Sequence, residues 1–402
     1  MNILVFNCGS SSLGYKVFEA EKGTCQVLVS GKAHRVGVKG KEPSFIEHRY
    51  GQRHTRQETP IATHRQAAGL VFDYLAGEKV HLDAVGHRFV HGGHLFQKSA
   101  LVTPENFKKL KACLPLAPLH NPTSLSMIEE TGRLHPGLGQ YVTFDSAFHT
   151  TLPEQAYTYA VPETLRKKFS YRKYGFHGLS YTYVTLKAAE FLRRPLKGLK
   201  LVACHLGTGG SSVAAIKDGY SVDTSMGFSP LQGLMMSTRC GDIDPMLSLY
   251  LMSVFGYRPD ALLDKLNRES GLLGVSGISS DLRDIIQSFH GPEGEDAKLS
   301  FSMYVQRLKK YVGAYATILQ GMDALIFTDD IGVGNHLVRE KLCQEMDWCG
   351  LFLDEELNRQ AKSDAIYRLE KPGSKVAILT IPTDEEYVIC REGEKLLSRR
   401  QI

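Results

Sequence analysis

The stretch KLVACHLGTGGSSVAAIKDGYSVDTS, residues 200–225, holds an apolar run, a turn of small residues, a second apolar run and an Asp-Gly turn before a third run. Apolar runs separated by turns of this kind predict antiparallel strands joined by hairpins. NILVFNCGSSSLGYKVFEA, residues 2–20, follows the same plan. Two such segments at the front of two successive halves predict a duplicated fold with a phosphate-binding turn in each domain. Two ordinary tight hairpins are the alternative.

Outward from these hairpins, strand patterns alternate with helical ones. AVGHRFVHGG (84–93) and YVTFDSAFH (141–149) read as strands ending in polar loops, whereas residues 299–322 have apolar side chains at helical spacing. The alternation predicts an α/β protein. We expect a first domain at 1–150 with a helix returning from the C-terminal end, a connecting segment at 151–195, and a donor-binding domain at 196–402.

Composition excludes several functional classes. Of the 402 residues, 43% are hydrophobic and 23% charged, which is typical of a globular protein. The net charge of +5 is spread along the chain and is too small to indicate a nucleic-acid partner. No apolar segment approaches the roughly 20 residues that span a bilayer, so we expect no membrane partner and a cytoplasmic protein. The eight cysteines lie far apart without a C-x-x-C pair and are expected to be reduced and mostly structural.

A third predicted turn contains negative charges that are unexpected in a phosphate-binding turn. DALIFTDDIGVGN, residues 323–335, reads as a buried strand running into a glycine-rich turn. Turns that hold phosphate offer small residues and backbone N–H donors to an anion. Asp329 and Asp330 instead place two carboxylates there.

An ordered set of motifs then identifies a resemblance. NCGSSS, HRFVHGG, APLHNP, FDSAFH, YGFHG, CHLGTGG, DTSMGFSPLQGLMMSTRCGDIDP, SGLLGVSGISSDLRDI and IPTDEE follow one another along nearly the whole chain. Together they resemble the acetokinase family of acetate and propionate kinases, within the actin, hexokinase and Hsp70-like ATPase superfamily. The resemblance implies two ribonuclease-H-like domains around a central cleft, assembled as a homodimer.

The same resemblance implies phosphoryl transfer between a donor, ATP or ADP, and a small carboxylate to form acetyl phosphate. Mg²⁺ is the implied cofactor, with Mn²⁺ as an alternative. Negative charge builds on the phosphoryl oxygens during such a transfer, so cations and fixed donors are needed. Arg88 and Arg239 match the arginines that grip the acyl substrate and the group in transfer; the simpler alternative pairs Arg239 with Asp242 or Asp244.

Other site residues are carried over from the resemblance. His177 matches a histidine that stabilises the transition state, with a core histidine as the alternative. Asp145 matches a catalytic acidic residue that orients the substrate or Mg²⁺ and is not a covalent nucleophile, with a strand-end turn former as the alternative. Asn7 and Glu385 match the Mg²⁺ positions, where the choice of Glu385 over its neighbour Glu386 rests on alignment alone.

The remaining matched residues form three groups. The acyl pocket is Val90, Leu119, Phe176 and Pro230. The phosphate loop contributes Ser10 and Ser12. The nucleotide-binding residues are His205, Leu206, Gly207, Thr208, Gly209, Asp281, Leu282, Arg283, Asp330, Gly332 and Gly334. Acetate and propionate differ by one methylene, worth about 1 to 3 kcal/mol in a pocket, so the sequence does not separate them.

Every departure from the family pattern falls on the donor side. Gly14 stands where similar kinases have lysine, Thr208 where they have asparagine, and Asp329 and Asp330 where they have glycines. A carboxylate about 4 Å from a phosphate oxygen costs on the order of 4 kcal/mol at an effective dielectric near 20.

Three accounts of these departures stay open. The aspartates point away from an ordinary ATP site, the donor has changed to pyrophosphate or another compound, or catalysis is lost and a binding or regulatory module remains. A sugar kinase or chaperone-like ATPase is a more distant rival. Because the acyl-side residues are retained, we expect an acetate kinase-like enzyme with an altered donor site.

Overall fold

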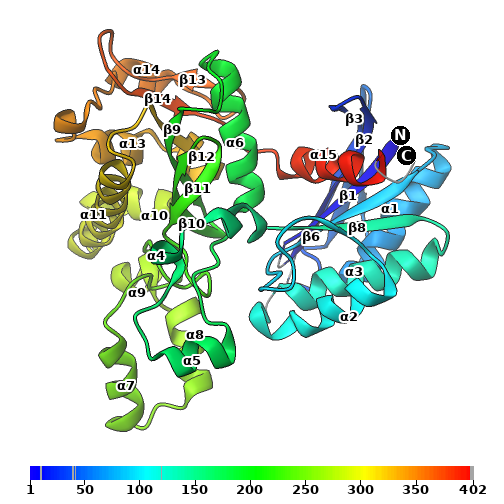
Figure 1. The fold of residues 1–402 in the computed structure, drawn as a ribbon, viewed down its shortest axis with the longest axis horizontal. Helices are drawn as coiled ribbons and strands as arrows, with labels where there is room; N and C mark the ends of the chain where they lie inside the picture. Colours follow the sequence, from blue (N-terminus) through cyan, green and yellow to red (C-terminus); the bar gives the residue numbers. More distant parts are fainter. Residues whose placement is uncertain (10, 39, 41, 119, 399–402) are drawn as a thin grey trace. The chain divides into compact units, whose positions relative to one another are not determined.

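The computed structural model describes residues 1–402 apart from 10, 39, 41, 119 and 399–402 (Figure 1). The chain folds as two compact units, Met1–Phe148 with Asp384–Ile402, and His149–Thr383. The segment 151–195, expected as a connection between domains, therefore lies within the second unit. Residues from Asp384 onward lie in the first unit rather than in a domain beginning at 196, and they carry the helix expected to return there.

The first unit is built on one sheet. Its strands in chain order are β1 (Asn2–Cys8), β2 (Ser12–Glu21), β3 (Thr24–His34), β4 (Phe45–Tyr50), β5 (Arg53–Glu58), β6 (Ala84–Phe89), β7 (Ala100–Leu101) and β8 (Gly139–Phe144). Its helices are α1 (His64–Gly77), α2 (Pro104–Ala112), η1 (Leu114–Leu116), α3 (Asn121–Leu134) and α15 (Glu385–Ser398), with η2 (Ala147–Thr151) at the boundary in sequence. The strand order is β5-β4-β3-β2-β1-β6-β8-β7.

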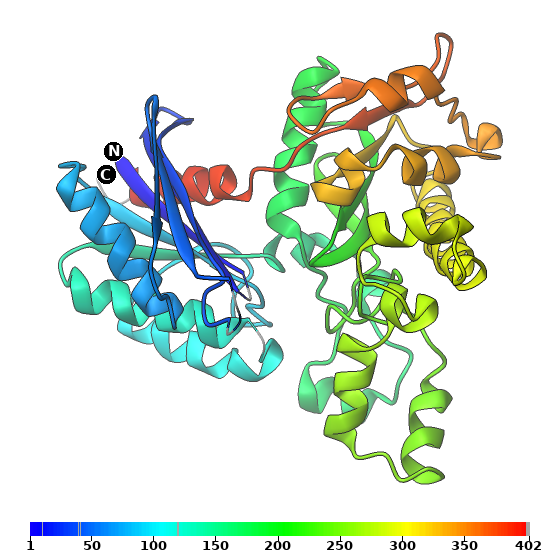
Figure 2. The ribbon, with the colours of Figure 1, turned by 180° about the vertical axis from the view of Figure 1, so that it is seen from behind.

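Both faces of this sheet are covered by helices. α1 and α3 lie on one face, where Phe72 and Met127 belong to the same core as Leu4 and Phe6 of β1. α15 lies on the other face, as Figures 1 and 2 show. Burial on both faces explains why β1 carries the continuous apolar run Ile3–Phe6 instead of an alternating pattern.

The second unit is built on a smaller sheet. Its strands are β9 (Lys200–Gly207), β10 (Gly210–Lys217), β11 (Tyr220–Thr224), β12 (Ala324–Thr328), β13 (Tyr367–Arg368) and β14 (Ala377–Thr380), in the order β11-β10-β9-β12-β14-β13. Its helices are α4 (Glu154–Tyr157), α5 (Glu163–Phe169), α6 (Gly178–Phe191), α7 (Pro245–Ser253), α8 (Pro259–Arg268), α9 (Gly271–Ser276), α10 (Leu282–Gln287), η3 (Ser288–His290), α11 (Gly294–Ile318), α12 (Asp329–Gly334), α13 (His336–Cys343), η4 (Asp347–Cys349) and α14 (Glu355–Gln360). None of the helices in the described residues has both the length and the apolar composition needed to cross a membrane.

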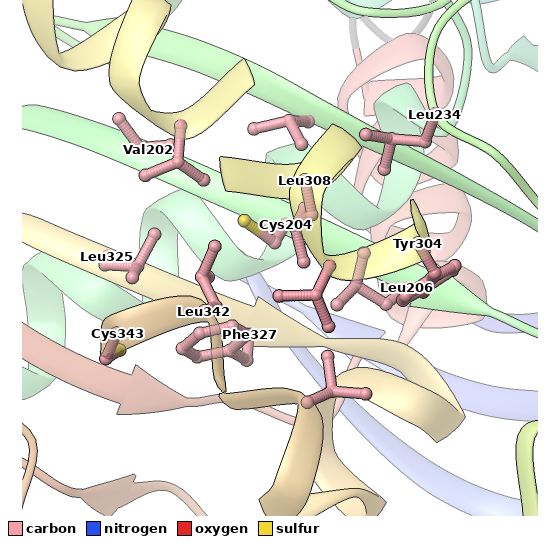
Figure 3. Packing of buried hydrophobic residues seen from close by; sticks show 14 of the residues in the cluster. Val202, Cys204, Leu206, Leu234, Tyr304, Leu308, Leu325, Phe327, Leu342 and Cys343 are labelled. Carbon is pink, nitrogen blue, oxygen red and sulfur yellow. The ribbon is translucent and has the colours of Figure 1, made fainter. Parts of the chain in front are cut away.

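The two sheets repeat one topology. In each, three antiparallel strands (β3-β2-β1 and β11-β10-β9) are followed by two strands parallel to the innermost one (β6-β8 and β12-β14). The predicted hairpins at 2–20 and 200–225 are therefore equivalent, and the duplicated α/β fold is confirmed. Figure 3 shows the core of the second unit, where Cys204 and Leu206 of β9 pack with Leu308 of α11 and Phe327 of β12.

A buried histidine makes the first unit sensitive to acid. His87 on β6 is 1% exposed, and its Nε2 lies 2.8 Å from the Gln140 side chain. Burial lowers the pKa of His87 from 6.5 to about 4, against the opposing effect of Gln140. The unfolded chain therefore binds a proton between pH 6.5 and 4 that the folded chain does not bind. The stabilisation is complete above pH 6.5 and is lost as the pH falls toward 4.

We expect the free energy of unfolding to fall by about 2 kcal/mol through His87 between pH 7 and pH 5. Urea unfolding at both pH values measures the change. The His87→Gln variant keeps a hydrogen-bonding side chain without an imidazole, and its pH dependence should be weaker by that amount. An equally steep pH dependence in wild type and His87→Gln would show that His87 titrates normally in the folded protein.

Candidate active site

Arg88 binds side chains from the carboxyl ends of neighbouring strands in the first unit. Its Nε and Nη2 donate to Asp145 Oδ1 and Oδ2 at 2.9 Å and 2.6 Å, a bidentate pair. Nη1 donates to Asn7 Oδ1 at 3.0 Å and lies 3.2 Å from Glu385 Oε2. Burial alone would lower the pKa of Arg88, but Asp145 and Glu385 outweigh it and raise the pKa above its ordinary value. Four predicted site residues thus form one cluster.

The fold explains why these residues meet. Asn7 is near the end of β1, Arg88 is near the end of β6, and Asp145 directly follows β8. Because β1, β6 and β8 are parallel neighbours, their carboxyl ends share one edge of the sheet. Glu385 begins α15 and reaches the same edge from the far end of the chain.

Lys16 joins this cluster and was not predicted from the sequence. Its Nζ lies 2.9 Å from Asp384 Oδ1 and 3.6 Å from Glu386 Oε2. Residues 14 and 16 of β2 face the same side of the sheet because side chains alternate along a strand. A Cβ on Gly14 would lie 3.7 Å from Glu386 Oε1. Similar kinases have lysine at position 14, where this chain has glycine. The alternation of side chains along β2 was the sequence signal that Lys16 places a positive charge on the same side of the sheet.

Glu386 is as much a part of the cluster as its neighbour. Asn7 Nδ2 donates to Glu386 Oε1 at 2.9 Å and to Glu385 Oε2 at 3.3 Å. Burial alone would raise the pKa of Glu386, but Lys16, the Asn7 hydrogen bond and Arg88 together hold it below its ordinary value. Both glutamates therefore present carboxylate oxygens at the start of α15.

The donor set of this cluster suits Mg²⁺. The carboxylates of Glu385 and Glu386 are hard oxygen ligands, and the Asn7 amide oxygen, which accepts from Arg88 Nη1 in this structure, is of the same kind. Among the described residues, no three or more His, Cys, Asp or Glu side chains are grouped to hold a metal ion. Mg²⁺ commonly takes one or two protein carboxylates and completes its shell with water and phosphate oxygens.

The second unit has a separate cluster centred on two stacked histidines. His177 precedes α6, and its ring lies 4.0 Å from that of His205 on β9 at an interplanar angle of 27°. His177 Nδ1 is 2.8 Å from Ser212 Oγ, which is 2.5 Å from Tyr181 Oη. These partners orient the His177 ring, and His177 is only partly buried, unlike a core histidine.

Arg239 lies beside His177. A Cβ on Gly210 would be 3.0 Å from Arg239 Nη1 and 3.5 Å from His177 Nε2, so both side chains lie close to the backbone of this glycine. In the described part of the chain, no carboxylate lies within 4.0 Å of the Arg239 guanidinium, whose nearest oxygen acceptor is Gly209 O at 3.5 Å. Burial lowers the pKa of Arg239. A desolvated cation without an acid partner is suited to binding an anion.

The alternative that paired Arg239 with a nearby aspartate is wrong. Asp242 binds Tyr311 Oη at 2.6 Å and the backbone N–H of Gly233 at 3.0 Å. Asp244 caps α7 by accepting from Met246 N at 2.9 Å. The carboxylates of Asp242 and Asp244 both bind other groups. The Arg239 guanidinium is therefore available to bind an anion.

Asp330 is bound to the turn between β9 and β10. Its Oδ1 accepts from the backbone N–H of Thr208 at 2.9 Å, and its Oδ2 accepts from the Thr208 hydroxyl at 2.8 Å. Thr208 and Asp330, which both depart from the family pattern, therefore bind each other. The carboxylate takes the kind of donors that a phosphate would take at such a turn.

Asp329 faces the same turn from the start of α12. Its Oδ2 lies 3.1 Å from His205 Nε2, and a Cβ on Gly207 would be 2.0 Å from that oxygen. Asp329 has φ of 64°, in the left-handed region that favours glycine. The expected glycine-rich turn is thus corrected: β12 runs directly into the short helix α12, and one left-handed residue makes the change of direction.

The other predicted nucleotide residues lie on α10, α12 and β9. Asp281 caps α10 and forms an ion pair with Arg283. Leu206 and Leu282 are buried in the core and can offer only backbone groups. Gly332 O accepts from the buried Arg339 at 2.9 Å, while Gly334 ends α12.

The predicted acyl pocket draws on residues of both units. Val90 follows β6 in the first unit, whereas Phe176 and Pro230 are in the second. Leu119 and the phosphate-loop Ser10 lie outside the described residues, and Ser12 begins β2 with its carbonyl accepting from Gly9 N at 2.9 Å. The pocket stays a prediction.

Comparison with known proteins decides the family. The model of the acetokinase family matches residues 2–391. The chain belongs to the acetokinase family. This member is 45% identical to the acetate kinase of Caldicellulosiruptor bescii over 407 aligned positions, covering 99% of the chain and all of that protein.

Solved structures of the acetokinase family have the same fold. The acetate kinase of Entamoeba histolytica is 42% identical with a TM-score of 0.89, covering 98% of this chain and 99% of that one. A propionate kinase from Francisella tularensis is 34% identical with a TM-score of 0.87, covering 97% and 98%. These matches confirm the predicted actin-like and hexokinase-like fold.

The Asp330–Thr208 contact generates a binding prediction for this acetokinase. Asp330→Asn removes the negative charge at the turn, and nucleotide affinity should rise by about tenfold because the site is exposed and partly screened. Titration calorimetry with ADP and Mg²⁺ measures the dissociation constant. Asp264→Asn, another exposed aspartate, on α8, serves as the control. Weaker binding by Asp330→Asn would instead show that the carboxylate builds the nucleotide site.

Proposed function

We propose that this protein is a phosphotransferase that moves a phosphoryl group between ATP or ADP and a short-chain carboxylate, with acetyl phosphate as the product from acetate. Membership of the acetokinase family over the whole chain supports the reaction class. The observation that carries the proposal is Arg239, a desolvated guanidinium without a carboxylate partner among the described residues, placed beside His177.

In the forward direction, a carboxylate oxygen of the acceptor attacks the terminal phosphorus of the donor. The new P–O bond forms as the bridging P–O bond breaks, and the electron pair leaves with the donor's remaining phosphates. Arg239 neutralises the charge that spreads over the equatorial oxygens. No covalent bond to the protein is needed.

His177 adds a directed hydrogen bond. The proposed order has the Tyr181 hydroxyl donating to Ser212 Oγ at 2.5 Å and the Ser212 hydroxyl donating to His177 Nδ1 at 2.8 Å, distances that fit either direction of donation. This order places the imidazole proton on Nε2, the edge nearest Gly210 and Arg239. His177 then donates to the phosphoryl group while staying neutral.

The first-unit cluster supplies the acceptor side and the cofactor. Glu385, Glu386 and Asn7 would hold Mg²⁺, which when bound would supply positive charge to neutralise the donor phosphates. Asp145 locks the Arg88 guanidinium through two parallel hydrogen bonds, which fixes the plane of the fork. Arg88 is proposed to bind the acceptor carboxylate. The match of Val90, Leu119, Phe176 and Pro230 to the acyl-pocket residues of similar kinases favours a short-chain acceptor.

A second candidate donor is supported by the Asp330–Thr208 contact. A carboxylate that occupies the turn donors disfavours a nucleotide and leaves a donor that uses other contacts, such as pyrophosphate. The same phosphoryl transfer chemistry then operates with a different leaving group. The third account is a binding module without catalysis. It is not favoured, because the Arg88 cluster of the first unit and the His177–Arg239 cluster of the second unit both retain their predicted residues.

The central test is a hydroxamate assay for acetyl phosphate with acetate, Mg²⁺ and, in separate reactions, ATP, GTP or pyrophosphate. Arg239→Ala should lower kcat/KM by at least about a hundredfold, as expected when a preorganised donor is lost. Arg359→Ala on the exposed face of α14 is the matched control and should keep full activity. Circular dichroism verifies folding. Near-normal turnover by a folded Arg239→Ala enzyme would remove Arg239 from the mechanism.

A homodimer is also proposed. Met246, Leu249, Tyr250, Phe255 and Leu263, here termed the α7–α8 apolar surface, are each between 50% and 63% exposed. α7 itself buries none of its residues within the chain. An apolar surface of this kind marks an interaction site, and a second copy of the chain can cover it by two-fold symmetry.

Phe255→Glu places a charge on the α7–α8 apolar surface and should convert the dimer to a monomer of 44.7 kDa. Light scattering coupled to gel filtration measures the mass. Leu299→Glu changes an equally exposed leucine on α11, outside this surface, and should leave the dimer intact. If Phe255→Glu keeps the wild-type mass, the subunits associate through another surface.

A further inference from the structure

Two cysteines from opposite ends of the chain meet in the first unit. Cys25 is the second residue of β3, and Cys390 lies within α15, 365 positions later. Cys390 Sγ donates to Cys25 Sγ at 2.9 Å, and both cysteines are free thiols. A disulfide has an S–S distance of about 2.05 Å, so the two atoms need to approach by less than about 1 Å to bond.

The other thiols in the chain are arranged differently. Cys113, Cys240 and Cys349 each donate to a backbone carbonyl oxygen, at 3.3 Å, 3.3 Å and 3.0 Å. Across the described residues, the Cys25–Cys390 contact is the one hydrogen bond between two sulfur atoms. Proximity therefore selects this pair for mutual oxidation.

The two thiols also differ in access and acidity. Cys25 is half-buried, whereas Cys390 is buried. The hydrogen bond from Cys390 lowers the pKa of Cys25, against the opposing effect of burial. That hydrogen bond and burial raise the pKa of Cys390. Since a thiolate is the nucleophile in exchange reactions, Cys25 is the attacking sulfur and Cys390 the sulfur that resolves the intermediate.

We propose that Cys25 and Cys390 are a redox modification site at which a small-molecule disulfide, such as oxidised glutathione, converts the thiol pair into a disulfide. The Cys25 thiolate attacks the small disulfide, forms a mixed disulfide and releases one thiol. Cys390 then gives up its proton, attacks Cys25 Sγ and releases the second thiol. The protein loses two protons and two electrons in total, and the small disulfide gains them as it becomes two thiols.

The bond would anchor α15 to the hairpin of β2 and β3. Near the same point, the Gly23 N–H donates to Glu394 Oε1 and Oε2 at 2.9 Å and 3.0 Å. α15 begins with Glu385 and Glu386, little more than one helical turn before Cys390. Oxidation therefore restrains the helix that carries both glutamates of the first-unit cluster.

The test treats the full-length protein with oxidised glutathione and counts thiols after denaturation. In wild type the count should fall from eight to six, and reduction by dithiothreitol should restore it. Peptide mapping without reductant should join the peptide containing Cys25 to the peptide containing Cys390. The Cys349→Ser control removes a partly exposed thiol of the second unit and should form the same link.

The variants separate the two roles. Cys25→Ser should keep its seven thiols, while Cys390→Ser should accumulate one glutathione on Cys25 because the resolving sulfur is missing. Hydrogen exchange of the α15 amides should slow on oxidation of wild type and stay unchanged in Cys25→Ser. A stable mixed disulfide on wild-type Cys25 without the Cys25–Cys390 link, or unchanged exchange in α15 after linkage, would overturn the proposal.

Discussion

The ion pair between Arg88 and Asp145 organises the first unit. The guanidinium is largely withdrawn from water and needs anionic partners, because removing one partner of a buried pair costs about 3–5 kcal/mol. Satisfying it requires the ends of β1, β6 and β8 and the start of α15 to meet at one point. The C-terminal helix is therefore held to the first sheet by charge as well as by packing.

On the donor side of the molecule, Arg239 and Asp330 are not paired with each other as Arg88 and Asp145 are. Arg239 is desolvated without an acid partner among the described residues, while Asp330 places an anion on the turn donors of Thr208. Asp329 faces His205 in the same way, so neither carboxylate is directed outward from the turn. Both carboxylates thus have partners within the chain, and the donors of the turn are already occupied.

Much of the fold could be predicted from the sequence because it depends on local patterns. The hairpins at 2–20 and 200–225 carry period-two runs and small-residue turns, and the structure places them at equivalent positions in the two sheets. The long helix α11 likewise follows from helical spacing. The boundaries between units could not be predicted, since α15 is a helix whose sequence neighbours lie in the other unit.

For the site, the kinds of residue present could be read from the chain alone: two arginines, a histidine, the acidic groups and the departures at residues 14, 208, 329 and 330. The three-dimensional arrangement decides which of these charged residues form ion pairs or hydrogen bonds with each other. Arg88 is bound to Asp145 while Arg239 is not paired with Asp242, and the fold brings Lys16 of β2 and Glu386 of α15 into the same cluster. The reason is that charge pairing depends on distances of a few ångströms between residues far apart in the chain, as between Thr208 and Asp330 or Cys25 and Cys390.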